Sequence, residues 1–255
     1  MCASYNTSTD MYPLNFATPG CLFIFNNRNF QNGLEEREGS ELDVQRLFDT
    51  FGELNFDVEC YINKTAKQLR TCIKKISNET DYTNIGSILI FIMSHGKENK
   101  IFGTDGEEVD LSEFIDPFKT VESLKEKPKL FFVNASRESR MTPVHDNAVE
   151  MDAAQEGNVH LNETAKIKID ADCFYGFSTV DNYFSIKESK KVSWFVQLFC
   201  DMIEQHKSTR DLLGIMTKVN DLVKRKEAID EDGRLVKMQS TCTLRKDFYF
   251  SKPKF

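Results

Sequence analysis

Two long apolar runs, each followed at once by polar residues, place the strongest constraint on what this chain can fold into. Residues 88–93 read Ile-Leu-Ile-Phe-Ile-Met and lead into Ser-His-Gly at 94–96. Residues 130–133 read Leu-Phe-Phe-Val and lead into Asn-Ala-Ser at 134–136. Such runs are typical of strands buried on both faces of a parallel sheet. Because functional groups gather beyond the carboxyl ends of these strands, we expect the histidine and the serine to lie near one sheet edge.

The remaining sequence alternates strand and helix patterns. Further strands are predicted at residues 21–25, 56–62, 172–177 and 243–250, and helices at residues 40–51, 65–76, 111–118, 193–203 and 211–223. Ser40, with Asp43 three residues on, is the predicted N-cap of the first helix, and Thr65 opens a capping box for the second. The Asp-Gly pair at 105–106 predicts a tight hairpin turn. The β-α-β-α-β order predicts an α/β fold, in which a mainly parallel sheet carries helices on both faces.

The composition limits the class of protein and its partners. The chain has 255 residues, of which 40% are hydrophobic, and a formal net charge of −7. This length allows one large domain, and the acidic balance argues against binding to nucleic acid or to anionic membranes. No apolar run approaches the roughly 20 residues of a membrane span, and no secretory pattern is visible. The seven cysteines are scattered, which favours reduced thiols in a cytoplasmic protein over disulfides or a zinc site. We expect no metal and no cofactor.

Two stretches lack hydrophobic periodicity. Residues 1–19 are polar and contain two prolines, which predicts a short flexible arm. Residues 139–165 are rich in Asn, Glu, Ala, Thr and Asp. A structureless segment of this length inside a compact domain is often functional.

The two strand ends resemble those of the caspase family of cysteine proteases. In that family the nucleophile motif is Gln-Ala-Cys-x-Gly, and the catalytic histidine lies roughly 50 residues before it. Residues 94–96 match the histidine motif, and Lys-Pro-Lys-Leu-Phe-Phe at 127–132 matches the approach to the nucleophile. Further matches in the same order occur at residues 26–27, 101–106, 176–179 and 193–197.

The resemblance, to an executioner-type caspase, covers residues 20–255 and carries expectations about architecture. It implies a caspase-like three-layer α-β-α sandwich around a mainly parallel six-stranded sheet. It also implies a large-subunit region at residues 20–138, an intersubunit linker at 139–165 and a small-subunit region at 166–255, behind the prodomain-like arm at 1–19.

The nucleophile motif departs from the family at three positions, because Asn134 replaces Gln, Ser136 replaces Cys and Glu138 replaces Gly. By resemblance, His95 would be the catalytic base, and the amide of Gly96 would join the oxyanion hole. A neighbouring imidazole can hold a thiol partly ionised, whereas a serine hydroxyl needs a base oriented by a further carboxylate. The change should therefore lower activity by a factor on the order of 10⁴ or more. We expect a site that is inactive, with Ser136 at the nucleophile position.

The resemblance also identifies residues that would hold a substrate aspartate, namely Arg37, Asn134, Ser185 and Lys187. Lys187 stands where the family has Arg, so the planar fork that grips a carboxylate is lost. Asn134 is one methylene shorter than Gln. Three of the candidate site residues also have an ordinary explanation. Arg37 lies among glutamates and fits a solvated charge cluster, Lys187 fits a solvated face, and His95 alone fits a loop histidine.

Two features indicate partners. Asp152 precedes an alanine within 139–165, as in a caspase processing site, although a generic acidic loop explains it equally well. In caspases the last small-subunit strand pairs with its counterpart across a two-fold axis, and residues 243–250 match that strand. We expect this chain to pair through it with an active caspase or with a second copy of itself. Binding of aspartate-containing peptides would be weakened.

The sequence therefore predicts a catalytically deficient caspase homologue that modulates an active caspase in apoptosis, by heterodimerisation or by competition. The alternative is a working endopeptidase that cleaves after aspartate, either through a native cysteine that Ser136 replaces by engineering or weakly through Ser136 itself. A third possibility is an interaction scaffold that binds no peptide. The changes at positions 134 and 138 favour natural decay, because engineering would leave the rest of the motif unaltered.

Overall fold

The computed structural model describes residues 11–31, 33–97, 99–135, 171–178, 193–225 and 239–254. Within them, six strands form one sheet in the order β2-β1-β3-β7-β8-β9. These strands are β1 (Cys21–Asn26), β2 (Asp57–Ile62), β3 (Ile88–Met93), β7 (Lys129–Asn134), β8 (Cys173–Phe177) and β9 (Gln239–Cys242). All neighbours pair in parallel except β8 and β9, which are antiparallel. The predicted mainly parallel sheet is confirmed.

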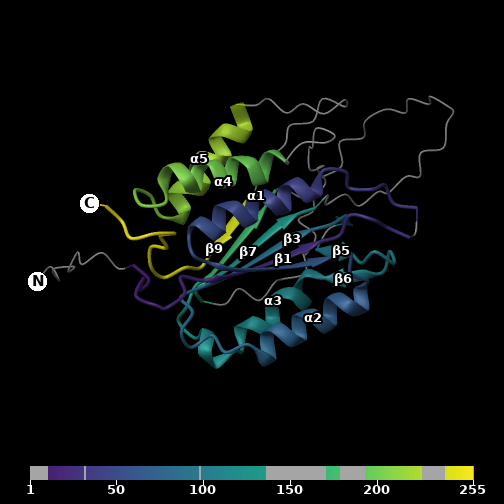
Figure 1. Cartoon of the computed structure of the whole chain (residues 1–255), viewed down its shortest axis with the longest axis horizontal. Helices are drawn as coiled ribbons and strands as arrows, with labels where there is room; N and C mark the ends of the chain where they lie inside the picture. Colours follow the sequence, from purple (N-terminus) through teal and green to yellow (C-terminus); the bar gives the residue numbers. More distant parts are fainter. Residues whose placement is uncertain are drawn as a thin grey trace, which may run out of the picture.

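Helices cover both faces of this sheet (Figure 1). They are α1 (Ser40–Glu53), α2 (Ala66–Glu79), α3 (Leu111–Lys119), α4 (Trp194–His206) and α5 (Leu212–Arg225), with a short 3₁₀ helix at Glu122–Leu124. Helices α1, α4 and α5 pack on one face, and α2 and α3 pack on the other. The capping box at Thr65 opens α2, as the sequence predicts. The molecule is the expected three-layer α-β-α sandwich.

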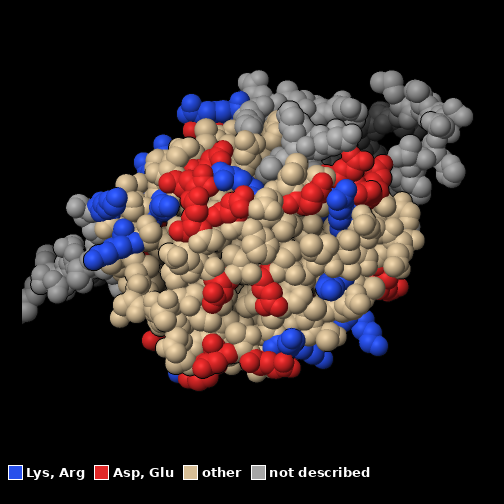
Figure 2. Space-filling view, viewed as in Figure 1, with Lys and Arg blue, Asp and Glu red and all other residues tan. Residues whose placement is uncertain are grey.

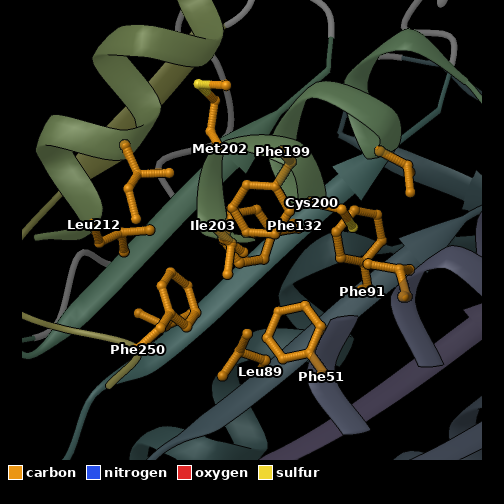
Figure 3. Close-up of a cluster of buried hydrophobic side chains, with 14 of the residues drawn as sticks. Phe51, Leu89, Phe91, Phe132, Phe199, Cys200, Met202, Ile203, Leu212 and Phe250 are labelled. Carbon is orange, nitrogen blue, oxygen red and sulfur yellow. The ribbon is translucent and has the colours of Figure 1, made fainter. Parts of the chain in front are cut away.

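Strands β1, β3 and β7 are buried at every position, which explains why their sequences show no polar alternation. Phenylalanines dominate the core between the sheet and the layer of α1, α4 and α5 (Figure 3). The ring centroid of Phe132 on β7 lies 4.7 Å from that of Phe199 on α4, and Phe51 on α1 lies 5.9 Å from Phe250. This packing joins distant segments of the chain and holds the carboxyl ends of the strands at a fixed edge.

A second sheet continues from the carboxyl end of β3. It consists of β4 (Gly96–Lys97), β5 (Lys100–Phe102) and β6 (Glu108–Asp110), paired antiparallel. The turn between β5 and β6 contains Gly106 at φ 79°, a conformation that favours glycine, so the predicted hairpin is confirmed. Asp105 Oδ1 accepts a hydrogen bond of 3.1 Å from the backbone N–H of Ala66. The hairpin is thereby anchored to the start of α2.

The start of α1 differs from the prediction. Gly39, at φ 71°, precedes the first helical turn, and no side chain caps the helix. The hydroxyl of Ser40 instead accepts a hydrogen bond of 3.3 Å from Asn26 Nδ2, and Asp43 Oδ1 accepts one of 2.5 Å from the backbone N–H of Ser193. The predicted N-cap was wrong because both side chains bind partners far away in the sequence.

The predicted strand at residues 243–250 was also wrong. The last strand is β9, and the chain then leaves the sheet so that Phe248 and Phe250 enter the core beside α1, α4 and α5. Asp247 forms an isolated parallel bridge with Met11. The apolar alternation of this segment therefore reflects burial against helices.

The described part of the predicted arm packs against the body of the protein. Tyr12 is only 3% exposed, and Thr18 forms a parallel bridge with Ile85. Residues 1–10 lie outside the described part of the chain, so the arm at 1–19 stays a prediction. The division into regions 20–138, 139–165 and 166–255 stays a prediction, because the linker lies outside the described residues.

In the described ranges, no helix is long and apolar enough to cross a membrane. The cysteines at positions 21, 60, 72, 173, 200 and 242 are free thiols in the structure.

Candidate active site

The carboxyl ends of β3 and β7 lie side by side. Met93, the last residue of β3, pairs with Asn134, the last residue of β7. His95 and Ser136 each follow two positions later, so both segments leave the sheet at the same level. The structure describes His95, whereas Ser136 lies outside the described residues. The proximity of the two segments is supported, and the placement of the serine hydroxyl stays a prediction.

Hydrogen bonds on both sides of His95 fix its backbone. Ser94 is buried, and its hydroxyl donates a hydrogen bond of 2.7 Å to the carbonyl oxygen of Phe102. The N–H of Phe102 donates one of 2.9 Å to the carbonyl oxygen of His95. Gly96 is buried at the start of β4, where it pairs with Ile101. The hairpin after β3 therefore sets the direction of the histidine and places Gly96 beside it.

The ring of His95 is held by the loop between β1 and α1. Its Nε2 lies 2.8 Å from the carbonyl oxygen of Glu35, and its centroid lies 4.8 Å from that of Phe30. A carbonyl oxygen only accepts hydrogen bonds, so Nε2 carries the proton and Nδ1 is the basic nitrogen of the neutral ring. Because this partner is uncharged, it stabilises a protonated imidazole less than the aspartate of a serine-protease triad does. The orientation prepares His95 to accept a proton at Nδ1.

Arg37 is half-buried and binds the end of β1. Its Nη1 donates hydrogen bonds to Asn26 Oδ1 and to the carbonyl oxygen of Asn27, both at 3.1 Å. Removal from water lowers the pKa of Arg37 to about 10, although the negative charge of Asp43 opposes the shift. The side chain remains cationic at neutral pH. This geometry does not fit the alternative of a solvated surface charge.

Asn134 is buried, with 1% of its surface exposed. Its Nδ2 donates a hydrogen bond of 3.0 Å to the hydroxyl of Ser193 at the start of α4. The backbone N–H of Ser193 donates in turn to Asp43 on α1, whose charge acts on Arg37. A polar network thus runs from β7 through α4 to α1 and connects two of the predicted substrate-binding residues. In this network the amide of Asn134 binds another residue of the protein, Ser193.

The structure brings part of the predicted site together. His95, Gly96, Arg37 and Asn134 all lie at the carboxyl edge of the main sheet. The other predicted site residues lie outside the described part of the chain, and they are Ser136, Ser185, Lys187 and Asp152.

Two contributors escaped the sequence analysis. Glu35 acts through its backbone carbonyl, and a backbone group leaves no pattern in a sequence. Ser193 was expected only as the start of a helix, yet its hydroxyl also accepts the Asn134 amide. A serine at a helix start often accepts a hydrogen bond, and this is the one signal in the sequence for a buried donor near Ser193.

Acidic and basic side chains are paired near the start of α1. Arg28 forms ion pairs with Glu36 at 2.6 Å and with Glu41 at 3.1 Å. Figure 2 shows acidic side chains gathered over the face where α1 and α4 lie.

Known proteins resemble this chain in sequence. Residues 20–249 match the family described as the caspase domain of the C14 peptidases. The chain belongs to the caspase family. It is 33% identical over 225 residues to caspase-3 of Bos taurus, with 87% of this chain and 77% of the relative covered. It is 30% identical over 256 residues to caspase-7 of Gallus gallus, with 96% and 81% covered. Caspase-3 of Felis catus is 32% identical over 213 residues, with 82% and 74% covered.

The caspase match confirms the resemblance to executioner-type members of the family. It spans every strand of the main sheet and the helices on both faces. The family assigned by sequence comparison therefore agrees with the fold seen in the structure.

Proposed function

We propose that this chain is a catalytically deficient caspase homologue that modulates an active caspase in apoptosis, by heterodimerisation or by competition for substrates and regulators. The observation that carries the proposal is Ser136, which occupies the place of the cysteine in the nucleophile motif. A hydroxyl at this position retains the fold and removes the reactive thiolate. We place this activity in the cytoplasm, where scattered reduced cysteines are common.

The surroundings of His95 support weak catalysis. Serine attack requires a base that withdraws the hydroxyl proton as the bond forms, and serine proteases stabilise the resulting imidazolium with a buried carboxylate. The Nε2 of His95 is held by the carbonyl oxygen of Glu35. A neutral partner orients the ring but provides little charge stabilisation. Replacement of cysteine by serine is therefore poorly compensated.

The binding side of the site supports the same conclusion. Asn134 directs one amide N–H to Ser193 and is only 1% exposed, so its amide is poorly accessible to a substrate carboxylate. Arg37 retains its charge, but its Nη1 is bound by Asn26 and Asn27. Weak recognition of aspartyl peptides follows.

The edge of the sheet supports pairing with another chain. Because residues 243–250 do not form a strand, the pairing edge is β9, which ends the strand order, so one of its sides pairs with β8 and the other faces away from the sheet. Gln239 and Ser240 on this strand are exposed and polar. The backbone groups on the open side of this edge can pair with an active caspase or with a second copy of this chain.

A second candidate is an endopeptidase that cleaves after aspartate. The charged Arg37 and the oriented ring of His95 favour it. It would act through a cysteine that Ser136 replaces, or weakly through Ser136 itself.

Hydrolysis of fluorogenic aspartyl tetrapeptides separates the two candidates. We expect no measurable activity for the chain as it stands, a small gain for Ser136→Cys and a larger gain when Asn134→Gln and Glu138→Gly are added. The control is His95→Ala in the triple variant, because loss of the base should remove the gain. Thermal unfolding of each variant shows that it is folded. Hydrolysis by the unaltered chain at rates typical of caspases would overturn the proposal.

Binding to an immobilised aspartyl peptide distinguishes a weakened site from a scaffold that binds no peptide. We expect weak binding that Arg37→Ala reduces further. Absence of binding, with no effect of Arg37→Ala, would favour the scaffold.

Association with an active executioner caspase tests the modulating role. The N–H of Thr243 donates to β8, and the alternation of an antiparallel strand then directs the N–H of Ser240 to the open side. Ser240→Pro removes that donor without touching the bonds to β8, and Ser240→Ala retains it. In analytical ultracentrifugation we expect the unaltered chain and Ser240→Ala to pair with the caspase, and Ser240→Pro to pair at least about tenfold more weakly. Equal affinities would exclude this edge, and the absence of any complex would leave competition as the only mode.

Processing after Asp152 is part of the proposal. An active executioner caspase should cut the chain once in residues 139–165, and Asp152→Ala should prevent the cut. Mass spectrometry of the fragments identifies the site. An intact chain after prolonged digestion would contradict this part of the proposal.

A further inference from the structure

Three side chains from distant parts of the chain meet at the amino ends of β7 and β8. The hydroxyl of Tyr12 donates a hydrogen bond of 2.6 Å to Asp172 Oδ1. Arg245 donates through Nε to the same oxygen at 3.0 Å and through Nη2 to Oδ2 at 2.6 Å. The backbone N–H of Arg245 also donates to the hydroxyl oxygen of Tyr12 at 3.1 Å. The Tyr12 hydroxyl is therefore both donor and acceptor within this cluster.

The cluster is built around a buried charge. Asp172 is 3% exposed, and burial alone would raise its pKa. The hydrogen bonds from Arg245 and Tyr12 outweigh burial and lower the pKa of Asp172 below its ordinary value. Burial, together with the bond to Asp172, raises the pKa of Tyr12, so the phenol keeps the proton that it donates. Loss of either donor would leave a buried carboxylate incompletely satisfied.

Backbone and apolar contacts reinforce the position of Tyr12. Its N–H donates a hydrogen bond of 3.0 Å to the carbonyl oxygen of Asp247, and Met11 forms a parallel bridge with the same residue. Its ring belongs to the same core as Phe248. Figure 1 shows the first described residues in purple beside the C-terminal segment in yellow, at the end of the sheet away from the β4–β6 hairpin.

The Tyr12 contact joins the start of the chain to its C-terminal part. Tyr12 precedes β1, whereas Asp172 directly precedes β8 and Arg245 follows β9. We propose that Tyr12 is a clasp that binds the C-terminal part of the chain, from β8 onward, to the remainder of the fold. The clasp adds to the pairing of β8 with β7 and to the packing of α4 on the sheet, so it strengthens the association of the two parts when the chain between β7 and β8 is cut. The clasp uses no residue of the candidate active site, so it is independent of the proposed function.

The test uses the full chain with a viral-protease recognition sequence placed within residues 139–165. After cutting, the dissociation constant of the two fragments is measured by dilution of a fluorescently labelled pair. We expect Tyr12→Phe to raise this constant at least about tenfold, because the variant removes a hydrogen bond to a buried charge.

Tyr82→Phe is the matched control. Tyr82 is fully buried, and its hydroxyl donates a hydrogen bond of 2.6 Å to the carbonyl oxygen of Ile76. Both residues lie before the cut, so this variant should lower the melting temperature of the uncut chain and leave the fragment dissociation constant unchanged. Equal effects of the two variants on that constant would overturn the proposal. If Tyr12→Phe does not fold, Asp172→Asn, which keeps the shape and removes the charge, should raise the constant, and no increase would overturn the proposal.

Discussion

The side-chain amide of Asn134, at the end of β7, donates a hydrogen bond of 3.0 Å to the hydroxyl of Ser193, at the start of α4. By the resemblance, this position would correspond to a glutamine that helps to hold the substrate aspartate in caspases. Here the shorter side chain is part of the internal structure. With 1% of its surface exposed, this amide is not presented to a substrate carboxylate in this geometry.

A double-mutant cycle on Asn134 and Ser193 tests this contact. Ser193→Ala leaves a buried amide without its acceptor and should lower the free energy of unfolding by about 1–3 kcal/mol. Asn134→Ala removes the donor, and the coupling energy of the pair should be about 0.5–1.5 kcal/mol. Urea denaturation measures all four proteins. A coupling energy near zero would mean that the hydrogen bond does not contribute to stability.

Acid should weaken the fold through Asp172, which faces Tyr12, Arg245 and, through its charge, Lys129. Although burial opposes ionisation, hydrogen bonds lower the pKa of this carboxyl below its ordinary value of 3.8. A carboxyl with a lowered folded pKa stabilises the fold above its unfolded pKa, and this contribution is lost as pH falls through the folded pKa.

The corresponding measurement is the unfolding free energy of the unaltered chain and of Asp172→Asn across the acid range. The variant should be less stable by about 1.5–3 kcal/mol at pH 7, and the difference should shrink below about pH 4. A difference that stays constant to low pH would contradict the assignment.

Two glycines should respond in opposite ways to replacement by alanine. A Cβ at Gly103 would lie 2.2 Å from the backbone nitrogen of Ala66, where the β5–β6 turn meets α2. Gly103→Ala should therefore destabilise the protein by about 1–3 kcal/mol. A Cβ at Gly52 in α1 meets nothing within 4 Å, so Gly52→Ala should stabilise the protein by about 0.5–1 kcal/mol. The melting temperatures of the two variants test this prediction. A shift of both in the same direction would be inconsistent with this packing.

Arg46 should contribute more to stability than an ordinary surface arginine. Its guanidinium binds Glu204 at 2.6 and 2.9 Å and Asp201 at 2.6 Å, which joins α1 to α4. Arg46→Lys loses the planar fork and should lower the unfolding free energy by about 1 kcal/mol at low salt, with a smaller loss at high salt. The control is Arg225→Lys, whose ion pair with Asp221 lies within α5 and is well exposed. Its effect should stay below about 0.5 kcal/mol, and chemical denaturation at two salt concentrations compares the variants.

Local patterns in the sequence were enough to predict the main sheet and most helices. The apolar runs of β3 and β7, the capping box at Thr65 and the Asp-Gly turn at 105–106 each depend on neighbours within a few residues. The same kind of reasoning failed for Ser40 and Asp43. Their spacing matches a helix cap, but their partners Asn26 and Ser193 lie 14 and 150 positions away. A local pattern does not reveal a competing long-range partner.

In the candidate site, too, local patterns identified residues but did not reveal their long-range partners. His95 and Arg37 were identified from the sequence, whereas the carbonyl group of Glu35 that holds the His95 ring was not. Arg37 looks solvated among its glutamate neighbours, yet the fold brings the end of β1 to its guanidinium. The segment at 243–250 looks like a strand because its aromatic residues alternate, yet Phe248 and Phe250 are buried against helices.

The sequence by itself determined the caspase fold, the two strand ends that form the candidate site and the presence of a serine at position 136. These follow from apolar periodicity and residue identity, which are properties of short stretches of chain. Only the tertiary structure decided that Asn134 binds Ser193, that Glu35 orients His95 and that Tyr12 meets Asp172. A buried polar group must find a partner wherever the packed chain provides one, and that choice is fixed only once distant segments are assembled.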